Sequence, residues 1–593
     1  MQQRIGRSPI SLGNYIKQLS KFVLSSSVVL VIAGLTGCGR GDQQTAATTD
    51  DANKANAVAE NVASIDTERL SAIVKVLASD EFEGRAPGTP GGRKTVKYLI
   101  EQFAALGLEP GGENGSWTHT VPMIRTQVQA PAALKFSVGG TLQALQQQTD
   151  IAVDTVRPVQ SIAIDAPVVF VGFGASAPER DWDDYGDIDL RGKVALYLVN
   201  DPDFAAAPDE PVAGRFGDRR MTYYGRWAYK FAEAARRGAT AALVIHETAA
   251  AGYGWNVPAS SPGENYAVVR DAAAADPVTL QGWLHGDAAA SLFSAAGYDL
   301  DELRVRARSP DFEAFELDDV IFSADLSVQV ETIESSNVLA KLPGTSRPDE
   351  ILMVTSHWDA YGIGEPDTEG RTVRPGANDD ALGTAGVLEI ARVLAAGPPL
   401  ARSVVFAAWT AEESGLLGSE AYASDPIYPL EKTVANLTLD ILQTAGPARD
   451  VILVGEGQSE LEDDLKSAAA GQRRVVTPEN LPENGLFFRA DHFSLAQRGV
   501  PVLLIMGIAG GADLVEGGRE AGDQWIADYV GSCYHQTCDA WSPDWDLRGA
   551  VEDIELFRTI IEDLGNSTRW PQWKEGSEFK AIREQSADAR LAR

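Results

Sequence analysis

Five side chains of the kinds that bind metal ions are spaced along the C-terminal half of the chain. Imidazole and carboxylate groups, without thiolates, are donors that suit zinc. Each candidate stands in a short motif: His357 in SHWDAYG, Asp379 in PGANDDALG, Glu413 in WTAEESG, Asp440 in NLTLD and His535 in CYHQTCD. The ordered set predicts a centre that holds two zinc ions, although manganese or cobalt would also suit these donors.

Three of these motifs begin where an apolar run ends. ILMVTS leads into His357, SVVFAAWT into Glu412 and Glu413, and VANLTL into Asp440. Such runs are typical of buried parallel strands. Ligands of open α/β sheets bind beyond the carboxyl ends of the strands, so we expect these side chains to share one crevice.

The order of segments predicts one catalytic domain interrupted by another. A length of 593 residues favours two or three domains, and 44% hydrophobic residues favour globular cores. Helical patterns precede residue 110, strand-like runs fill a block from about 131 to 330, and strand and helix alternate again from 331. The fold class is α/β. The block's GFGASA lacks the third glycine of a dinucleotide fingerprint.

The net charge of -33 argues against a nucleic-acid partner, because phosphate binding needs a basic patch. We therefore expect no nucleic acid to bind.

The N-terminus carries a pattern of export. Basic residues precede an apolar stretch that is too short to span a bilayer, and Leu35-Thr36-Gly37-Cys38 resembles a bacterial lipobox. We expect residues 1–38 to be a lipoprotein signal, Cys38 to be lipidated, and 39–63 to be a flexible tether. Gly39, directly after Cys38, favours transport of the lipoprotein to the outer membrane. The protein would face the periplasm or the cell surface, and the lipid would be its sole membrane anchor. The alternative is an ordinary signal peptide.

Two other cysteines, Cys533 and Cys538, flank Tyr534 and His535. In an oxidising compartment they would form a short disulfide loop that fixes the histidine. Two buried thiols are the alternative.

Taken together, the motifs resemble those of peptidase family M28, the zinc aminopeptidases and carboxypeptidases whose superfamily includes glutamate carboxypeptidase II and the transferrin receptor. The resemblance implies the zinc exopeptidase fold, a mixed and largely parallel central sheet flanked by helices. It implies a peptidase domain split into 64–130 and 331–575, a β-rich insert at 131–330 similar to a protease-associated domain, and a C-terminal tail at 576–593.

The resemblance also implies roles for the ligand candidates. Asp379 matches the carboxylate that bridges two zinc ions. His357 and Asp440 match the other ligands of one ion, and Glu413 and His535 those of the second. Asp380 is interpreted as a packing or turn residue.

Five further residues match positions with other roles in the family. Glu412 matches the general base, Asp359 a carboxylate that orients His357, and Tyr534 a hydroxyl that donates to the oxyanion. Arg489 and Asp491 resemble a segment lining the substrate cleft, with a salt bridge as the alternative.

These implications predict an aminopeptidase that removes N-terminal residues from peptides or proteins. One alternative is a carboxypeptidase or dipeptidase of the same family, which needs a basic residue such as Arg489 for the substrate carboxylate. Others are a glutaminyl cyclase-like acyltransferase with a single metal, and a noncatalytic binding protein. The sequence leaves substrate preference, the role of the insert and oligomeric state open.

Overall fold

A computed structural model describes residues 64–260, 263–269 and 276–591. All of them fall within one compact unit. The expected signal with Cys38 and the expected tether at 39–63 lie outside the described residues. Among the helices in these ranges, none combines the length and the apolar character needed to cross a membrane.

Four parallel strands form the sheet of the C-terminal half. Their order is β20 (Val502–Ile505), β17 (Thr433–Leu439), β13 (Arg347–His357) and β16 (Arg402–Trp409). Every residue of β16, β17 and β20 is buried. Both faces of a parallel sheet are covered by helices, which explains why these strands read as apolar runs in the sequence.

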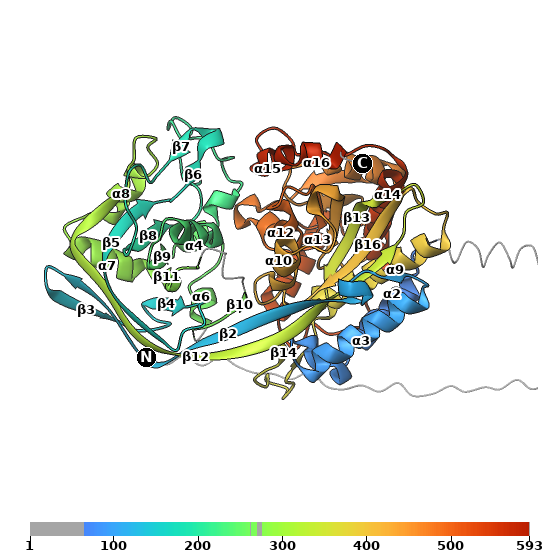
Figure 1. Ribbon diagram of the computed structural model, residues 1–593, viewed down its shortest axis with the longest axis horizontal. Coiled ribbons are helices and arrows are strands. Elements are labelled where there is room, and N and C mark those ends of the chain that lie inside the picture. Colours follow the sequence, from blue (N-terminus) through green and yellow to red (C-terminus); the bar gives the residue numbers. More distant parts are fainter. Residues whose placement is uncertain (1–63, 261–262, 270–275, 592–593) are drawn as a thin grey trace, which may run out of the picture. The chain divides into compact units, whose positions relative to one another are not determined.

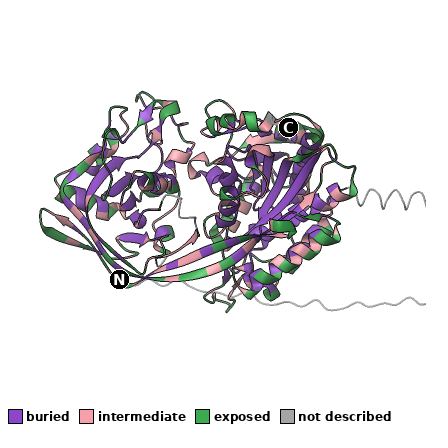
Figure 2. Cartoon of the chain, viewed as in Figure 1, coloured by how far each residue is buried: buried purple, intermediate pink, exposed green. Residues whose placement is uncertain are grey.

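Helices supply the cover on both faces (Figure 2). One core joins the sheet to α2 (Thr67–Leu77), α3 (Pro90–Ala105), α9 (Leu382–Ala396) and α14 (Arg548–Asn566). A second core packs side chains of α10 (Leu417–Ser424) and α12 (His492–Ala496) on the other face. On α14, Ile554, Phe557 and Ile561 are fully buried in this core.

Two long antiparallel strands connect this half to the insert. β2 (Thr118–Val138) and β12 (Phe315–Leu342) lie side by side (Figure 1), paired from Thr118 with Val338 to Val138 with Val320. The far end of β12 pairs with β16, so the sheet continues from one half into the other. The domain boundaries expected at 130/131 and 330/331 therefore fall inside continuous strands.

The insert has its own parallel strands and helices. β5 (Ser161–Gly172), β8 (Val194–Leu198), β9 (Ala241–Ile245) and β11 (Leu280–Leu284) are parallel neighbours. Parallel neighbours need crossover connections, which are usually helices. α4 (Trp227–Arg236), α7 (Gly286–Ala295) and α8 (Leu300–Arg306) are present, so "β-rich" describes only part of this region.

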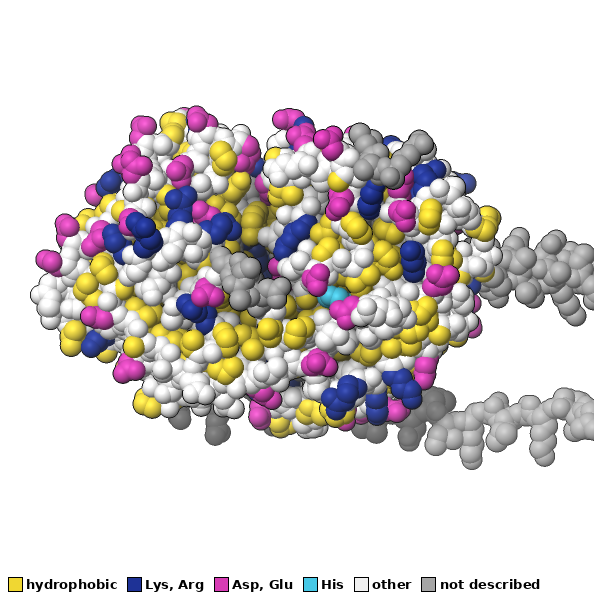
Figure 3. All heavy atoms as spheres, viewed as in Figure 1, with side chains coloured by type: hydrophobic (Ala, Val, Ile, Leu, Met, Phe, Trp, Pro, Cys, Tyr) yellow, Lys and Arg dark blue, Asp and Glu magenta, His cyan; other side chains and the backbone are white. Residues whose placement is uncertain are grey.

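The remaining elements are short. The expected tail at 576–593 includes α15 (Lys580–Gln585) and α16 (Ala587–Leu591), and its Arg583 is buried and donates to the carbonyl of Thr433 at 2.9 Å. Charged side chains of both signs are interspersed with hydrophobic ones on the face seen in Figure 3. The other strands and helices are β1 (Glu109–Pro110), β3 (Thr141–Leu145), β4 (Ile151–Asp154), β6 (Ser176–Ala177), β7 (Trp182–Asp183), α5 (Thr248–Ala251), α6 (Asn256–Ser260), β10 (Glu264–Val268), β14 (Gly362–Ile363), β15 (Val373–Arg374), β18 (Asp450–Leu453), α11 (Leu461–Gly471), β19 (Val475–Pro478), α13 (Gly518–Asp528), α15 (Lys580–Gln585) and α16 (Ala587–Leu591).

Candidate metal centre

Three ligand candidates follow the carboxyl ends of neighbouring parallel strands. His357 is the last residue of β13, Asp440 comes directly after β17, and Glu413 follows the end of β16 by four residues. These strands are adjacent in the sheet, in the order β17-β13-β16. The candidates therefore meet at one sheet edge, the place where open α/β sheets bind ligands.

Asp379 lies between the two histidines, in the turn that precedes α9. Its Oδ1 is 3.1 Å from Nε2 of His357, and its Oδ2 is 3.2 Å from Nε2 of His535. One carboxylate thus presents each of its oxygens to a different imidazole. A carboxylate that bridges two metal ions needs this arrangement.

Each histidine has a second carboxylate beside it. Asp440 Oδ1 is 4.0 Å from Nε2 of His357, and Glu413 Oε2 is 3.4 Å from Nε2 of His535. The structure therefore brings the five candidates together as two groups that share Asp379. His357, Asp379 and Asp440 are buried, whereas the His535 side chain keeps 29% of its surface exposed.

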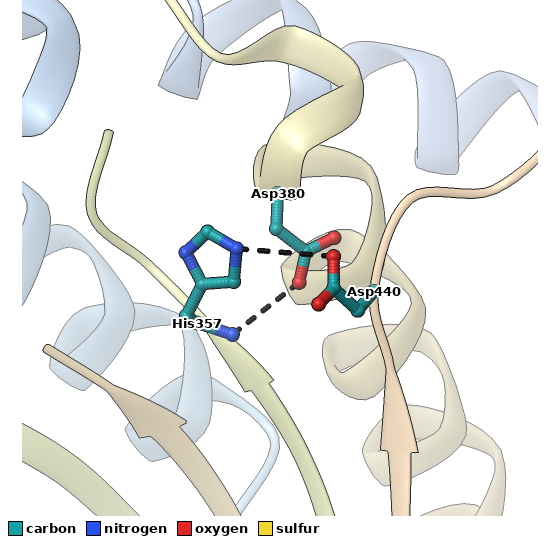
Figure 4. Close-up of side chains that lie close together, drawn as sticks. All are labelled: His357, Asp380 and Asp440. Atoms are coloured by element: carbon teal, nitrogen blue, oxygen red, sulfur yellow. Dashed lines mark hydrogen bonds and ion pairs between the residues drawn. The ribbon is translucent and has the colours of Figure 1, made fainter. Parts of the chain in front are cut away.

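Asp380 also lies within this cluster (Figure 4), close enough to His357 and Asp440 to form a group of potential ligands. Its oxygens, however, accept main-chain N–H groups from His357 at 3.3 Å, Gly383 at 2.9 Å and Ile441 at 3.4 Å. These bonds join the end of β13, the start of α9 and the segment after β17. Asp380 thus acts on the site by positioning the ligand-bearing segments.

Glu412 stands at the same edge, with Oε2 4.0 Å from Nε2 of His357. Burial raises the pKa of Glu412 well above its usual value; the charge of His357 opposes this shift, and the charges of Asp440 and Asp491 add to it. The place of Glu412 beside the ligand candidates puts a carboxyl group where it can exchange a proton with a group bound at the centre.

The donor set fits divalent cations. Burial, the largest contribution in both cases, raises the pKa of Asp440 to about 7 and the pKa of Asp491 to about 8. Oδ2 of Asp359 and both oxygens of Asp491 are buried without a hydrogen-bond donor among the described residues. Packing this many carboxylates around two imidazoles costs free energy unless cations compensate the charge. Nitrogen and oxygen donors without sulfur suit zinc, manganese or cobalt.

Asp359 contacts His357, but mainly through its main chain. The Nδ1 atom of His357 is 3.2 Å from the Asp359 carbonyl oxygen and 3.6 Å from its carboxylate. The carboxylate instead accepts the main-chain N–H of Glu412 at 3.1 Å. Asp359 therefore holds both the imidazole and the segment that carries the two glutamates.

His535 is fixed by its loop and by a tyrosine. Cys533 and Cys538 form a disulfide around it, and His535 has a φ of +64°. Its Nδ1 lies 3.0 Å from the hydroxyl of Tyr361. Sequence reasoning missed Tyr361, whose only signal is its place four residues after His357 in SHWDAYG.

Tyr534 packs against the same histidine, with ring centroids 3.6 Å apart. Burial, as the largest contribution, raises the pKa of Tyr534 well above its usual value. The charge of Asp379 adds to this shift, and the charge of Arg489 opposes it. The hydroxyl therefore stays protonated and able to donate a hydrogen bond at this site.

Arg489 and Asp491 also lie near the centre. The charge of Arg489 lowers the pKa of Asp440, and the charge of Asp491 raises that of Glu412. Neither carboxylate oxygen of Asp491 has a hydrogen-bond partner among the described residues, so Asp491 does not pair with Arg489. His492, in contrast, packs edge-on against Phe487, 4.9 Å between centroids, and contacts no ligand candidate.

Two further residues that sequence reasoning missed hold the site from behind. Asp539 accepts the main-chain N–H groups of Asn378 at 2.9 Å and Asp379 at 3.1 Å. Arg85, fully buried, donates to the carbonyls of Trp358 and Gly376, each at 2.7 Å. Neither position carries a sequence signal, because the partners are main-chain atoms far away in the chain.

The paired clusters at the carboxyl edge of a parallel sheet define a metal-dependent α/β enzyme. More particularly, residues 337–557 match the model of Peptidase family M28. All five ligand candidates lie within the segment that matches this family model.

Curated relatives are similar over parts of the chain. Leupeptin-inactivating enzyme 1 of Streptomyces exfoliatus is 28% identical over 228 residues, which are 37% of this chain and 47% of that protein. Aminopeptidase NAALADL1 of Mus musculus is 36% identical over 121 residues, 19% of this chain and 14% of that protein. The chain thus spans less than half the length of both relatives.

Solved structures are similar to this chain over a larger share of its length. An aminopeptidase from Aneurinibacillus sp. strain AM-1 is 19% identical with a TM-score of 0.46, covering 86% of this chain and 96% of that one. The zinc aminopeptidase BSAP from Bacillus subtilis is 17% identical with a TM-score of 0.41, covering 87% and 98%.

Proposed function

We propose that the chain is a metallo-exopeptidase with two zinc ions, an aminopeptidase that hydrolyses the N-terminal bond of peptides. The observation that carries the proposal is the position of Asp379, whose two oxygens each face a different histidine. His357 and Asp440 would complete one metal site, and Glu413 and His535 the other. Bound there, a pair of divalent ions would supply Lewis acidity to the attacking water and to the scissile carbonyl group.

Chain residues supply the proton transfers. Glu412, next to the ligand Glu413 and 4.0 Å from His357, takes a proton from the attacking water. It then returns that proton to the nitrogen of the leaving amine. The protonated hydroxyl of Tyr534 donates to the oxygen on which negative charge develops. Arg489 and Asp491 lie where substrate groups would contact the centre.

The test combines metal content with hydrolysis of an aminoacyl chromogenic amide and an N-blocked dipeptide. We expect about two zinc ions per chain, hydrolysis of the first substrate, and loss of activity upon chelation that zinc restores. Glu412→Gln should lower kcat by about 100- to 10,000-fold with the metal content retained. Unchanged hydrolysis in this variant would overturn the catalytic assignment.

Three alternatives give different results in the same test. Hydrolysis of the N-blocked dipeptide alone would favour a carboxypeptidase, and Arg489, whose charge lowers the pKa of Asp440, makes this the strongest alternative. A single metal ion with cyclisation of N-terminal glutamine would indicate an acyltransferase. Metal binding without any turnover would indicate a binding protein.

We also propose, from the lipobox-like sequence, that the protein is an exported lipoprotein anchored through Cys38, with the protein facing the periplasm or the cell surface. Radiolabelled fatty acid should enter the wild-type protein and not a Cys38→Ser variant. Labelling of that variant would contradict the proposal.

A further inference from the structure

A cavity of about 760 Å³ adjoins the candidate metal centre on the side of Glu413. Glu413 and Tyr361 of the centre line it, and so do residues of three strands, β10, β2 and β12. A group bound in this cavity would therefore lie close to the peptide bond that the centre is proposed to hydrolyse.

One face of these three strands forms a wall of the cavity. β10 pairs with β2, and β2 pairs with β12, both antiparallel (Figure 1). Residues directly opposite each other in such a sheet point to the same face, and so does every second residue along a strand. The register puts Tyr266, Arg125 and Glu331 in one row across the sheet, and Met123 opposite Ile333 in the next row. All five of these residues line the cavity, so the sheet presents one continuous face to it.

The row that contains Met123 is apolar and packs towards the centre. Met123 is buried in a small core with Ala411, the residue directly before Glu412, and Ile333 packs against the same core. The row with the charged side chains lies two residues away along the strands, which is about 7 Å, and further from the end of β12 that pairs with β16. A side chain that enters from the centre therefore meets apolar surface first and charged groups second.

The charged part of this face carries two carboxylates around one guanidinium group. Arg125 donates through Nε to Glu264 at 2.9 Å, and its Nη1 atom lies 3.3 Å from Glu331. The hydroxyl of Tyr266 donates to Glu264 at 2.9 Å and holds that carboxylate in place. The side chain of Glu331 keeps 55% of its surface exposed, so its carboxylate is accessible to a ligand. Among the described residues that line the cavity outside the metal centre, carboxylates thus outnumber cationic groups.

Building on the proposed peptidase function, we propose that this cavity binds a lysine or arginine side chain of the peptide substrate. The aliphatic stem of such a side chain matches the apolar row, and its cationic head group reaches the carboxylates beyond that row. Glu331 accepts charge-assisted hydrogen bonds from the head group, which are stronger than those between neutral groups. The basic side chain belongs either to the N-terminal residue or to the residue on the leaving-group side. The insert takes part in the choice of substrate through β10.

Two substrate pairs test this proposal in the wild-type enzyme and separate the two positions. Each pair compares lysine with norleucine, which is lysine without the terminal ammonium group: the two aminoacyl para-nitroanilides, and Leu-Lys amide against Leu-norleucine amide. We expect kcat/KM of the lysine substrate to exceed that of its norleucine counterpart by about 5- to 20-fold in at least one pair, which identifies the position. Equal values or a preference for norleucine in both pairs would overturn the pocket, whereas no hydrolysis of any substrate would overturn the proposed function.

Two variants locate the effect. Glu331→Gln should lower kcat/KM of the preferred lysine substrate by about 5- to 20-fold, mainly through KM, and change that of the norleucine substrate less than about twofold. Glu334→Gln is the matched control, because Glu334 is exposed on the same strand but lies three residues further on and thus on the opposite face. Each change removes one negative charge from a chain of net charge -33, so a general attraction of cations would weaken equally in both. Equal effects of the two variants on the lysine substrate would contradict the pocket.

Charge reversal and salt give two further measurements. Glu331→Lys should remove the preference for lysine and favour a glutamate substrate over its glutamine counterpart by about twofold or more. In the wild-type enzyme, the preference for lysine should fall when the ionic strength rises from about 0.01 to about 1 M, because salt screens a carboxylate that is partly exposed. A preference for lysine that survives both Glu331→Lys and high salt would overturn the role of Glu331.

Discussion

Single carboxylates organise the centre by giving their two oxygens to different partners. Asp379 divides its oxygens between two histidines, whereas Asp380 and Asp539 receive main-chain N–H groups. The five ligand candidates were visible in the sequence because three of them follow apolar runs. Tyr361, Arg85 and Asp539 were not, because a residue that binds remote main-chain or imidazole atoms leaves no local pattern.

Tyr361 should tune the metal affinity of His535. Removing its hydroxyl in Tyr361→Phe takes away the hydrogen-bond partner of Nδ1, and loss of such a partner typically weakens metal binding by about 10- to 100-fold. Zinc titration against a competing chelator measures this. Tyr428→Phe, which loses a hydroxyl bond to Gly111 away from the site, is the control. Equal affinities of wild type and Tyr361→Phe would refute this role.

Glu479 should make stability depend on pH. Burial raises the pKa of Glu479 to about 7, and its Oε2 is buried without a partner. The folded state therefore binds a proton that the unfolded state releases, and stability falls as pH rises from about 4.5 to 7. Glu479→Gln, neutral throughout, should be more stable than wild type by about 3 kcal/mol at pH 8 and nearly equal to it near pH 4.5.

Thermal unfolding at both pH values measures this difference. The exposed neighbour Glu456, changed to Gln, should show the wild-type profile. If the difference in stability between Glu479→Gln and wild type were the same at both pH values, the raised pKa of Glu479 would be contradicted.

At the scale of elements, the parallel strands were predicted from their apolar runs, and their ends meet at one edge. The long strands β2 and β12 were not predicted. Their residues alternate between buried and exposed over long stretches, and Pro131 falls within β2, where a change of character suggested a boundary. Tertiary pairing overrides that local signal, because β12 supplies hydrogen-bond partners along nearly the whole of β2.

The disulfide loop should matter more for activity than for stability. Cys533 and Cys538 enclose only four residues, and closing so short a loop adds little to the free energy of unfolding. The double change Cys533→Ser and Cys538→Ser frees His535 from its left-handed conformation. We expect kcat/KM to fall by about tenfold or more, because a small displacement of a catalytic group is costly.

Differential scanning calorimetry and zinc content complete this experiment. The apparent Tm should move by only a few degrees, while zinc content falls towards one ion per chain. Wild-type activity in the double variant would show that the loop is not needed to hold the histidine.

At the scale of the whole chain, the insert contacts the peptidase part through more than the two long strands. Tyr223 packs on Phe493 and accepts a hydrogen bond from Gln497 at 2.8 Å. The sequence indicated an interrupted domain, but it contained no signal for this contact, which depends on residues about 270 positions apart. Contacts between distant segments are visible only after folding.

Tyr223→Ala should loosen this junction. Truncating a packed aromatic side chain costs about 3–5 kcal/mol in a core and less at a partly exposed junction. We expect faster cleavage by a protease within the insert and retained hydrolysis of a neutral aminoacyl amide. Limited proteolysis followed by mass spectrometry measures it. Tyr298→Phe, which loses only a hydroxyl contact with Asp318 within the insert, is the control, and equal cleavage rates would count against the contact.

The ladder between β2 and β12 also makes the insert excisable. Gln127 is paired with Gln329 in antiparallel register, so the two strands approach each other as the arms of a hairpin. A two-residue Asn-Gly turn in place of 128–328 has the geometry to close such arms. The shortened chain would keep every metal-ligand candidate, lose the packing of Tyr223 on Phe493, and leave the edge of β2 that β10 now covers bare and prone to self-association.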